Sequence, residues 1–551
     1  MSVRRIALAV AAGLALADAS IVTLALPEVL RDLHTTIEGV AAVIGLYTLV
    51  IAVVLLPFER LAARWSVRGT GTCGFALMAV ASVACAVAHS LPVLLLARGA
   101  QALGGAAGLA TVFELLAGAR GRGRELWVWT AVFATAIGPA IGGALTQAFS
   151  WRAIFVFQVP IAVAGAVAVI AGPARAPGAL REAAPPSQGP RFAWRPAAAL
   201  ALVSASVSAV LFLLVLLLVA GWDVSPLGAA AAVTVIPIAA IAGARIRGDA
   251  RTRAIAGCAL VGGGVLALAW LPTASLWWTV PPQLLAGAGM GLALTALGGE
   301  LLPERTPRDA ARLLTLRYAG IAVILAIAAP IAAHELNAAT FTAREQGVAL
   351  VLDASLPPLE KIKLAPALLT GVQSDQPRSG LRRAVAAERG RFQGAELATY
   401  DLLGRRADDT LITAVGKAFR SSFLLAGAAG FLGAFLLIAG ARLAPLVVAA
   451  VLAAGVPLAY VALHSAVAPT PPAILDPCTA NRTPPSGGGL TGFLQRQALT
   501  LLDRTACRLG SSREELVLAL ADKDDATRFQ RKYGVDPRTA GGLLQGLLGG
   551  G

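Results

Sequence analysis

Two residues that can carry charge stand inside long apolar stretches of the sequence. Asp18 lies in the stretch 6–27, and Arg98 lies near the start of the stretch 93–116. A charge at the centre of a bilayer costs about 3 kcal/mol on insertion scales, so each residue is expected to face a cavity or a partner. Asp18 can gain and lose a proton, whereas Arg98 stays charged and can hold a nearby acid ionised or coordinate a substrate. Both are candidates for proton coupling; the alternative is a static buried pair that only fixes helix packing.

Three more polar residues join these candidates. Gln101 follows Arg98 by one helical turn. Glu114 and Arg317 lie nearer the expected cytoplasmic ends of their apolar stretches, where a long side chain can instead reach the interface. Asp18, Arg98, Gln101, Glu114 and Arg317 form the expected proton-coupling and transport set.

The elements that must position these residues are membrane-spanning helices. Of 551 residues, 57% are hydrophobic and 14% are charged, and the mean hydropathy is +0.73. An ordinary soluble domain is about a quarter charged, so a soluble enzyme is excluded. The net charge of +15 comes from arginines in short loops between apolar segments, so it sets membrane orientation and does not indicate a nucleic-acid partner.

Apolar runs of about 20 residues, long enough to cross the bilayer as helix, recur through the first 465 positions. The start of the chain, Met1 to Arg5 before an apolar run, also resembles a secretory or twin-arginine signal, but the run continues to Pro27. We therefore expect thirteen spans, near residues 6–27, 39–57, 70–88, 93–116, 126–147, 152–172, 197–219, 226–244, 254–271, 276–298, 313–334, 421–440 and 443–464.

Orientation follows from the positive charge in alternate short loops. One side carries twenty arginines, and the opposite short loops carry only Arg31 and Arg152. The N-terminus is therefore expected in the cytoplasm of a multi-pass protein in the plasma (cytoplasmic) membrane. The arginine-rich side holds Arg4, Arg5, Arg60, Arg64, Arg68, Arg120, Arg122, Arg124, Arg175, Arg181, Arg191, Arg195, Arg245, Arg247, Arg251, Arg253, Arg305, Arg308, Arg312 and Arg442.

Polar segments divide the chain. A Pro-rich cytoplasmic linker at 173–195 separates six helices from six, and two polar segments, 335–420 and 465–551, are expected outside. All five lysines fall in these two external segments. The expected organisation is an N-terminal six-helix lobe (1–172), the linker (173–195), helices 7–11 of a C-terminal lobe (196–334), an external insertion (335–420), helix 12 (421–440), an extra helix 13 (441–464) and an external tail (465–551).

The tail carries the only cysteine pair on the expected oxidising side. Cys478 and Cys507 are candidates for a disulfide, and no cysteine or histidine spacing suggests a metal site. Helical periodicity over 490–533 predicts a two-helix module in which Ser512 caps the second helix. Helical patches such as 381–403 are also expected in the insertion.

Three motifs in the first six spans resemble those of the major facilitator superfamily, in particular its drug:proton antiporter branch. Residues 16–27 read LADASIVTLALP, similar to D-x-T-V-V-x-x-A-L-P in span one. Residues 98–106 read RGAQALGGA, similar to R-x-x-Q-G-x-G-x-A in span four. GPAIGG at 138–143 is similar to the antiporter signature G-P-x-x-G-G, and WRAIFVFQVP at 151–160 to its continuation W-R-x-x-F-x-x-N-x-P.

The signature glycines also have a physical logic of their own. Gly138, Gly142 and Gly143 let two helices approach closely, and Pro139 lets its helix bend. We expect a packing and leak-preventing role, although generic small-residue packing would explain the same glycines.

The resemblance is weaker elsewhere. The second half matches loosely at 221–226 (GWDVSP) and 316–320 (LRYAG). The family's cytoplasmic loop G-x-L-A-D-R-x-G-R-R, which helps lock the outward-facing state, reads ERLAARWSVR here at 59–68. Its acid is replaced by alanine, so gating through Glu59, Arg60, Arg64 and Arg68 either uses Glu59 as a substitute acid or works differently. The resemblance does not extend to segments 335–420 and 465–551.

The resemblance implies an all-α membrane protein: a 6+6 helix bundle, here with a thirteenth helix and two polar external segments. It implies proton-coupled export of small apolar or amphipathic compounds by alternating access. No G-x-x-x-x-G-K-[ST] motif indicates ATP as the energy source, and no cofactor is expected. The expected partners are a small-molecule substrate, a proton, the lipid bilayer and a protein that binds 335–420 or 465–551. The alternative is a non-transporting receptor or scaffold that presents these external modules.

Overall fold

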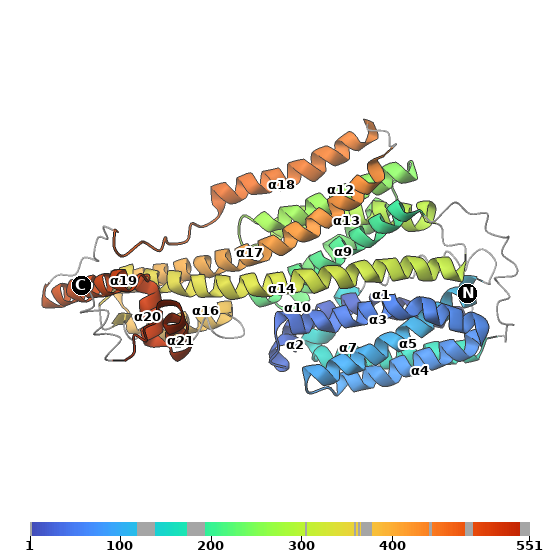
Figure 1. The fold of residues 1–551 in the computed structure, drawn as a ribbon, viewed down its shortest axis with the longest axis horizontal. Helices are drawn as coiled ribbons and strands as arrows, with labels where there is room; N and C mark the ends of the chain where they lie inside the picture. The colour runs from blue at the N-terminus through green and yellow to red at the C-terminus, as the bar shows by residue number, and fades with distance from the viewer. Residues whose placement is uncertain are drawn as a thin grey trace. The chain divides into compact units, whose positions relative to one another are not determined.

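Helices form all the regular structure in the part of the chain that the computed structural model describes (Figure 1). That part comprises residues 3–117, 138–172, 193–302, 306–357, 360–361, 364, 377–439, 444–479 and 489–539. The chain divides into two compact units. The first contains Met1–Ala220, Val224–His334 and Phe419–Val467, and the second contains Gly221–Asp223, Glu335–Ala418 and Ala468–Gly551.

The N-terminal part of the first unit is a group of mutually packed helices. α4 packs against α5 and α7, and α1 packs against α5 and α7. Side-chain caps start two helices: Thr36 accepts from the Gly39 amide, and Ser66 accepts from the Gly69 amide. The helices are α1 (Val3–Thr23), α2 (Leu26–Asp32), α3 (Ile37–Arg64), α4 (Val67–Ala86), α5 (Leu91–Ala117), residues 138–148 and α7 (Trp151–Ile170).

The later helices of the first unit form a second group. α12 packs against α13, and α11 also packs against α13. The Ser422 hydroxyl donates to the Ala328 carbonyl at 3.1 Å, which joins α17 to α14. The helices are α9 (Trp194–Leu216), α10 (Pro226–Val233), α11 (Val235–Ala244), α12 (Ala250–Ala267), α13 (Leu276–Thr295), α14 (Pro307–Asp353), α17 (Gly394–Ile438) and α18 (Val447–Val467). One-turn π-helices, η1 (Leu217–Gly221) and η3 (Ala296–Leu301), extend α9 and α13.

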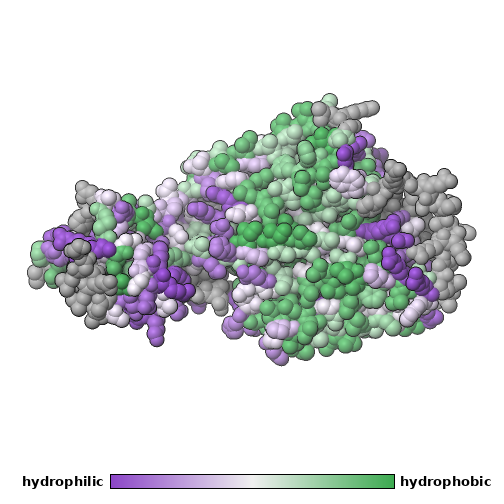
Figure 2. Space-filling model, in the orientation of Figure 1, coloured by the Kyte–Doolittle hydropathy of each residue, from purple (hydrophilic) through white to green (hydrophobic). Residues whose placement is uncertain are grey.

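Twelve helices of the described part are long and apolar enough to cross a membrane. They coincide with the predicted spans except for 126–147, of which residues 126–137 lie outside the described part and 138–147 are helical. The face of the first unit seen in Figure 2 carries hydrophobic residues over the middle of its helices and hydrophilic residues near their ends. This surface is expected where lipid surrounds the helices. The chain is a multi-pass membrane protein.

The stretch predicted as a thirteenth span forms α18, which packs against α12. Ala453 of α18 lies against Gly263 of α12, where an added methyl group would overlap the Ala453 backbone. The Tyr460 hydroxyl donates to the Trp278 carbonyl at 2.7 Å. Most of the other large side chains of α18 are exposed, as expected for a helix that faces lipid.

Long helices run from the first unit into the predicted insertion. α14 continues without a break to Asp353, and α17 begins at Gly394, whereas this part of the second unit starts at Glu335. The helical residues predicted over 381–403 are divided among α16 (Pro377–Glu388), the 3₁₀ turn η4 (Arg389–Arg391) and the start of α17. Gly394, with a φ of 56°, marks the break.

The tail module has three helices where two were predicted: α19 (Gly489–Leu509), α20 (Arg513–Ala521) and α21 (Lys523–Tyr533). Ser512 caps α20 as predicted, since its hydroxyl accepts from the Glu515 amide at 2.9 Å. Asp522 ends α20 and caps α21 through the Asp524 and Asp525 amides. Asp522 is therefore the sequence signal that separates α20 from α21.

The second unit joins the two polar segments, which lie far apart in the sequence. Val348 of α14 packs with Leu518 of α20. Arg344 of α14 forms a bidentate ion pair with Asp525 of α21, with nitrogen–oxygen distances of 3.1 and 2.5 Å. Both of these side chains are buried, so the pair would be costly to break.

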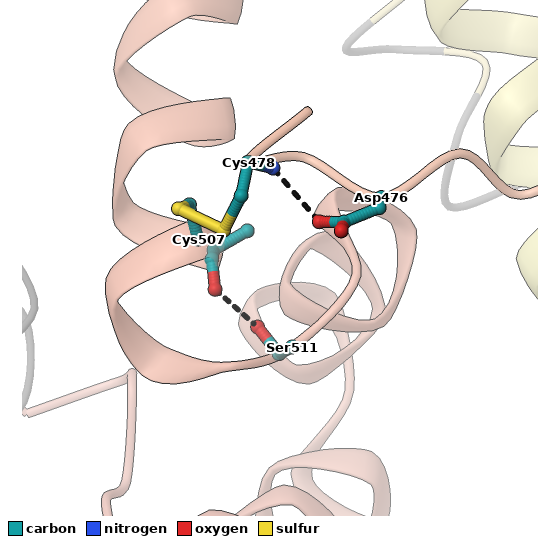
Figure 3. The surroundings of a disulfide bond; sticks show 5 residues. Asp476, Cys478, Cys507 and Ser511 are labelled. Carbon is teal, nitrogen blue, oxygen red and sulfur yellow. Dashed lines mark hydrogen bonds between the residues drawn. A yellow bond between two sulfur atoms is a disulfide. The ribbon is translucent and has the colours of Figure 1, made fainter. Parts of the chain in front are cut away.

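A disulfide joins Cys478, in the segment that precedes α19, to Cys507 of α19 (Figure 3). The Cys478 amide donates to the Asp476 carboxylate at 2.9 Å. The Ser511 hydroxyl, just after α19, donates to the Ala506 carbonyl at 3.5 Å. The bridge therefore ties the Pro-rich stretch to the helical module.

Candidate functional site

Asp18 and Arg98 form an ion pair inside the N-terminal helix group. The Arg98 Nη2 atom lies 2.6 Å from the Asp18 Oδ2 atom, and neither side chain has any exposed surface. Asp18 is carried by α1 and Arg98 by α5, both of which are apolar along most of their length. The two charges therefore stay paired without contact with lipid or water.

Amide side chains extend this pair into a network that crosses four helices. The Arg98 Nη1 atom donates to Gln101 Oε1 at 2.6 Å. Gln101 Nε2 donates to Gln158 Oε1 of α7 at 2.5 Å and to Ser82 Oγ of α4 at 2.8 Å. Gln158 Nε2 donates to Asp18 Oδ1 at 2.8 Å, which closes a ring of hydrogen bonds. A change at Asp18 therefore acts on α4, α5 and α7 together.

Other contacts fix the guanidinium of Arg98. Its Nε atom donates to the Val43 carbonyl of α3 at 3.2 Å. Its carbon Cζ lies 4.3 Å from the ring centre of Tyr47 and 5.7 Å from that of Phe155. The Tyr47 hydroxyl of α3 donates to the Ala15 carbonyl of α1 at 3.0 Å, so Tyr47 connects the Arg98 guanidinium to the helix that carries Asp18.

A cavity of about 50 Å³ lies between the two helix groups of the first unit. Leu16, Ala19, Ser20 and Thr23 of α1 line it, so it borders the helix that carries Asp18. Asp18 itself does not line the cavity. The other lining residues are Ile44, Ser204, Val207, Ser208, Leu211, Phe212, Met290, Leu294, Arg317, Tyr318, Ile321 and Leu325.

The glycines of residues 138–143 lie at close helix contacts. A methyl group added to Gly142 would overlap the Ile21 carbonyl of α1, and one added to Gly138 would overlap the Ser20 hydroxyl. One added to Gly143 would overlap Ala230 of α10, in the other helix group. Pro139 is buried. These glycines thus bring their helix against both groups.

The remaining predicted residues are dispersed. Glu114 is buried on α5, and it lines no part of the cavity. Arg317 of α14 lines the cavity, whereas Asp18, Arg98 and Gln101 do not. In the predicted gating loop (59–68), Glu59 is buried, whereas Arg60, Arg64 and Arg68 are exposed.

The sequence prediction missed Gln158, Tyr47 and Ser204. Gln158 stands where the resemblance has asparagine in the span-six motif, and that substitution was the available signal. Tyr47 and Ser204 lie in otherwise apolar runs, where neither type is unusual.

Comparison with known proteins places these motifs in a family. The family model "Major Facilitator Superfamily" matches residues 8–330. The multidrug resistance protein Stp of Mycobacterium tuberculosis (strain CDC 1551 / Oshkosh) is 36% identical over 150 residues, which cover 26% of this chain and 28% of Stp. The methylenomycin A resistance protein of Bacillus subtilis (strain 168) is 32% identical over 167 residues, covering 29% of this chain and 36% of that protein. The match thus spans about a third of these curated relatives.

A solved structure shares the fold. A bacterial homolog of the human lysosomal transporter Spinster, in an inward-facing and unoccupied conformation, matches with a TM-score of 0.54 and 14% identity over 80% of this chain and 98% of that one. The family match covers more than half of the 551 residues and extends from the first helix group into the second, as far as α14. The chain is therefore a transporter of the Major Facilitator Superfamily.

Proposed function

We propose that this transporter exports small apolar or amphipathic compounds in exchange for protons. The observation that carries the proposal is the fully buried Asp18–Arg98 pair, placed on the helix that borders the cavity. The resistance functions named for the partial relatives agree with export.

The network suggests how a proton could change the structure. When Asp18 binds a proton, its attraction to Arg98 falls, while Arg98 keeps its charge. The guanidinium must then rely on Gln101 and the Val43 carbonyl, so the contact between α1 and α5 weakens. Because α1 also lines the cavity, proton binding and substrate binding can compete through this helix. Alternating access would follow as the two helix groups rock about the cavity.

Gradient-driven accumulation in proteoliposomes tests this proposal. An imposed pH gradient, acid inside, should drive uptake of fluorescent amphipathic compounds from a screening panel. Asp18→Asn should abolish the effect of the gradient, because the amide cannot bind and release the proton. Glu38→Gln makes the same chemical change at an exposed acid and should behave as the natural protein does. Accumulation by Asp18→Asn that still depends on the gradient would contradict the proposal.

For topology, we propose a cytoplasmic N-terminus, α18 as a thirteenth crossing, and external positions for 335–420 and 465–551. The arginine distribution supports the first point. The disulfide supports an oxidising environment for the tail. A domain organisation of an N-terminal lobe (1–172), the linker (173–195) and a C-terminal lobe made of 196–334 and helix 12 (421–440) agrees with this arrangement.

The second candidate is a receptor or scaffold that presents the second unit to a protein partner. The buried ion pairs and the disulfide of that unit favour this alternative, because transport alone does not require such a module. Single-molecule distances between the two helix groups would decide. A single fixed conformation under every gradient and ligand would favour the scaffold over the transporter.

A further inference from the structure

The charge that lines the cavity between the helix groups is of positive sign. Arg317 is the one ionisable cationic residue among its lining residues, and no acid lines it within the described part. The sequence extends this observation to the whole set of predicted spans, in which Asp18 and Glu114 are the only acidic residues. Asp18 is engaged with Arg98 and Gln158, and Glu114 does not line the cavity.

The cavity wall also contains a buried hydrogen-bond donor without a partner. The Ser204 side chain is 4% exposed, and its hydroxyl has no hydrogen-bond partner in the described part although it lines the cavity. A buried hydroxyl without a partner destabilises the protein, because it has given up its hydrogen bonds to water. A ligand that accepts a hydrogen bond from this hydroxyl is therefore favoured. The hydroxyls of Ser20 and Thr23 donate to carbonyls of their own helix, Ala17 and Ala19.

Most of the other lining residues are apolar, including Leu211, Phe212, Met290 and Leu294, and Ser208 and Tyr318 add two further hydroxyl groups. A volume of about 50 Å³ has room for a small polar group, since a cavity of about 10–15 Å³ by such a measure already holds one water molecule. A whole amphipathic molecule would need the helix groups to separate, as alternating access provides. This arrangement of one cation, a buried hydroxyl donor without a partner and largely apolar walls suits a negatively charged end group on an apolar body.

We infer that the cavity binds amphipathic substrates through an anionic end group, which Arg317 attracts and to which Ser204 donates. The inference rests on the proposed transport function, because it names the substrate class of the same cavity. A cationic amphipath would meet the positive charge of Arg317 in a wall whose described lining residues include no acid, and would be disfavoured.

Equilibrium binding to the full chain in nanodiscs tests the inference with three probes that share one ring system. These are 1-pyrenebutyrate, neutral 1-pyrenebutanol and the corresponding butyl-trimethylammonium cation, each corrected for binding to empty nanodiscs. The anion should bind at least tenfold more tightly than the cation. Arg317→Gln should remove this preference, Arg317→Lys should keep its direction, and Ser204→Ala should weaken the anion severalfold.

Arg312→Gln is the matched control, because this exposed arginine lies on the same helix and outside the cavity. Its binding preferences should equal those of the natural protein. Equal or tighter binding of the cation, no binding of the anion, or an unchanged preference in Arg317→Gln would overturn the inference. Binding does not require a pH gradient. An anion preference without gradient-driven uptake would therefore refute the proposed coupling and leave the inferred site standing.

Discussion

Among single residues, two glutamines complete the hydrogen bonds of the buried Asp18–Arg98 pair: Gln101 accepts from Arg98, and Gln158 donates to Asp18. A buried ion pair gains little over an apolar contact, but removing one partner is strongly destabilising. Gln158 supplies a donor to Asp18 and an acceptor to Gln101. It is therefore as much a part of the site as the charges.

Replacement of Gln158 by leucine should lower the stability of the protein. Asp18 Oδ1 would lose its amide donor, and an unsatisfied buried polar group costs about 1–3 kcal/mol. Thermal unfolding in detergent, followed by tryptophan fluorescence, should show a lower Tm. Gln147→Leu makes the same change at an exposed position and should have little effect. Equal Tm values for the two variants would show that the ring of hydrogen bonds is not needed.

Glu345, outside the apolar stretch 313–334, makes the second unit sensitive to pH. Its pKa is raised to about 7 from 4.5, first because burial disfavours its charge and then because Glu515 is near. Lys532 and the Ser512 hydroxyl oppose this shift, and Glu514 adds to it.

Between pH 4.5 and 7 the folded protein retains a proton on Glu345 that the unfolded chain releases. The free energy of unfolding should therefore fall as the pH rises through this window. Because Glu345 is partly exposed, we expect a change of about 1–2 kcal/mol. Hydrogen exchange of α20 and α21, corrected for intrinsic rates, measures it. Glu345→Gln should flatten the dependence and Glu396→Gln, at an exposed acid, should not; stability that rises with pH would contradict the assignment.

At the scale of helices, glycines set the distances that the site depends on. Helix 138–148 contacts α1 through Gly142 and α10 through Gly143, so it touches both helix groups. Its position there agrees with a role in closing one side of the cavity.

Gly142→Ala should separate α1 from helix 138–148 or strain both, because the new methyl group would overlap the Ile21 carbonyl. Overpacking of this kind costs about 1–3 kcal/mol. Proteoliposomes containing the variant should leak protons faster in the absence of substrate. Gly45→Ala is the control, since nothing lies within 4 Å of the added atom. If neither variant increased the proton leak, Gly142 would serve only helix packing and not leak prevention.

α18 depends on a similar contact with α12. Gly263→Ala would drive a methyl group into the Ala453 backbone and should release α18 from α12. Hydrogen exchange of α18 should then increase, while α13 should stay protected. Gly455→Ala is the control: Gly455 lies on α18 itself, and no atom lies within 4 Å of the added methyl group, so the exchange of α18 should not increase. Unchanged exchange in Gly263→Ala would mean that Tyr460 and its partner are enough to hold α18.

At the scale of the whole molecule, the polar segments form a unit of their own. Its disulfide closes a loop of 29 residues, which stabilises the folded tail by about 3–4 kcal/mol in the chain-entropy model. Disulfides of this kind are typical of the oxidising side of the membrane, where we propose that the tail lies.

A membrane-impermeant thiol reagent on intact cells should therefore label Cys478 and Cys507 only after external reduction. The double variant Cys478→Ser with Cys507→Ser should lose this labelling and serves as the control. Labelling without reduction would contradict the disulfide. Labelling only after lysis would place the tail inside and remove α18 as a crossing.

The sequence by itself determined the membrane class, the family and most of the spans, because apolar length and loop charge are local properties. It also identified Asp18 and Arg98, since a charge within an apolar run is conspicuous. Only the tertiary structure decided that Gln158 completes their network, that Arg317 and Ser204 share one cavity, and that residues 335–353 pack with the tail. The physical reason is that these contacts join residues far apart in the chain, and no local pattern records which apolar faces meet.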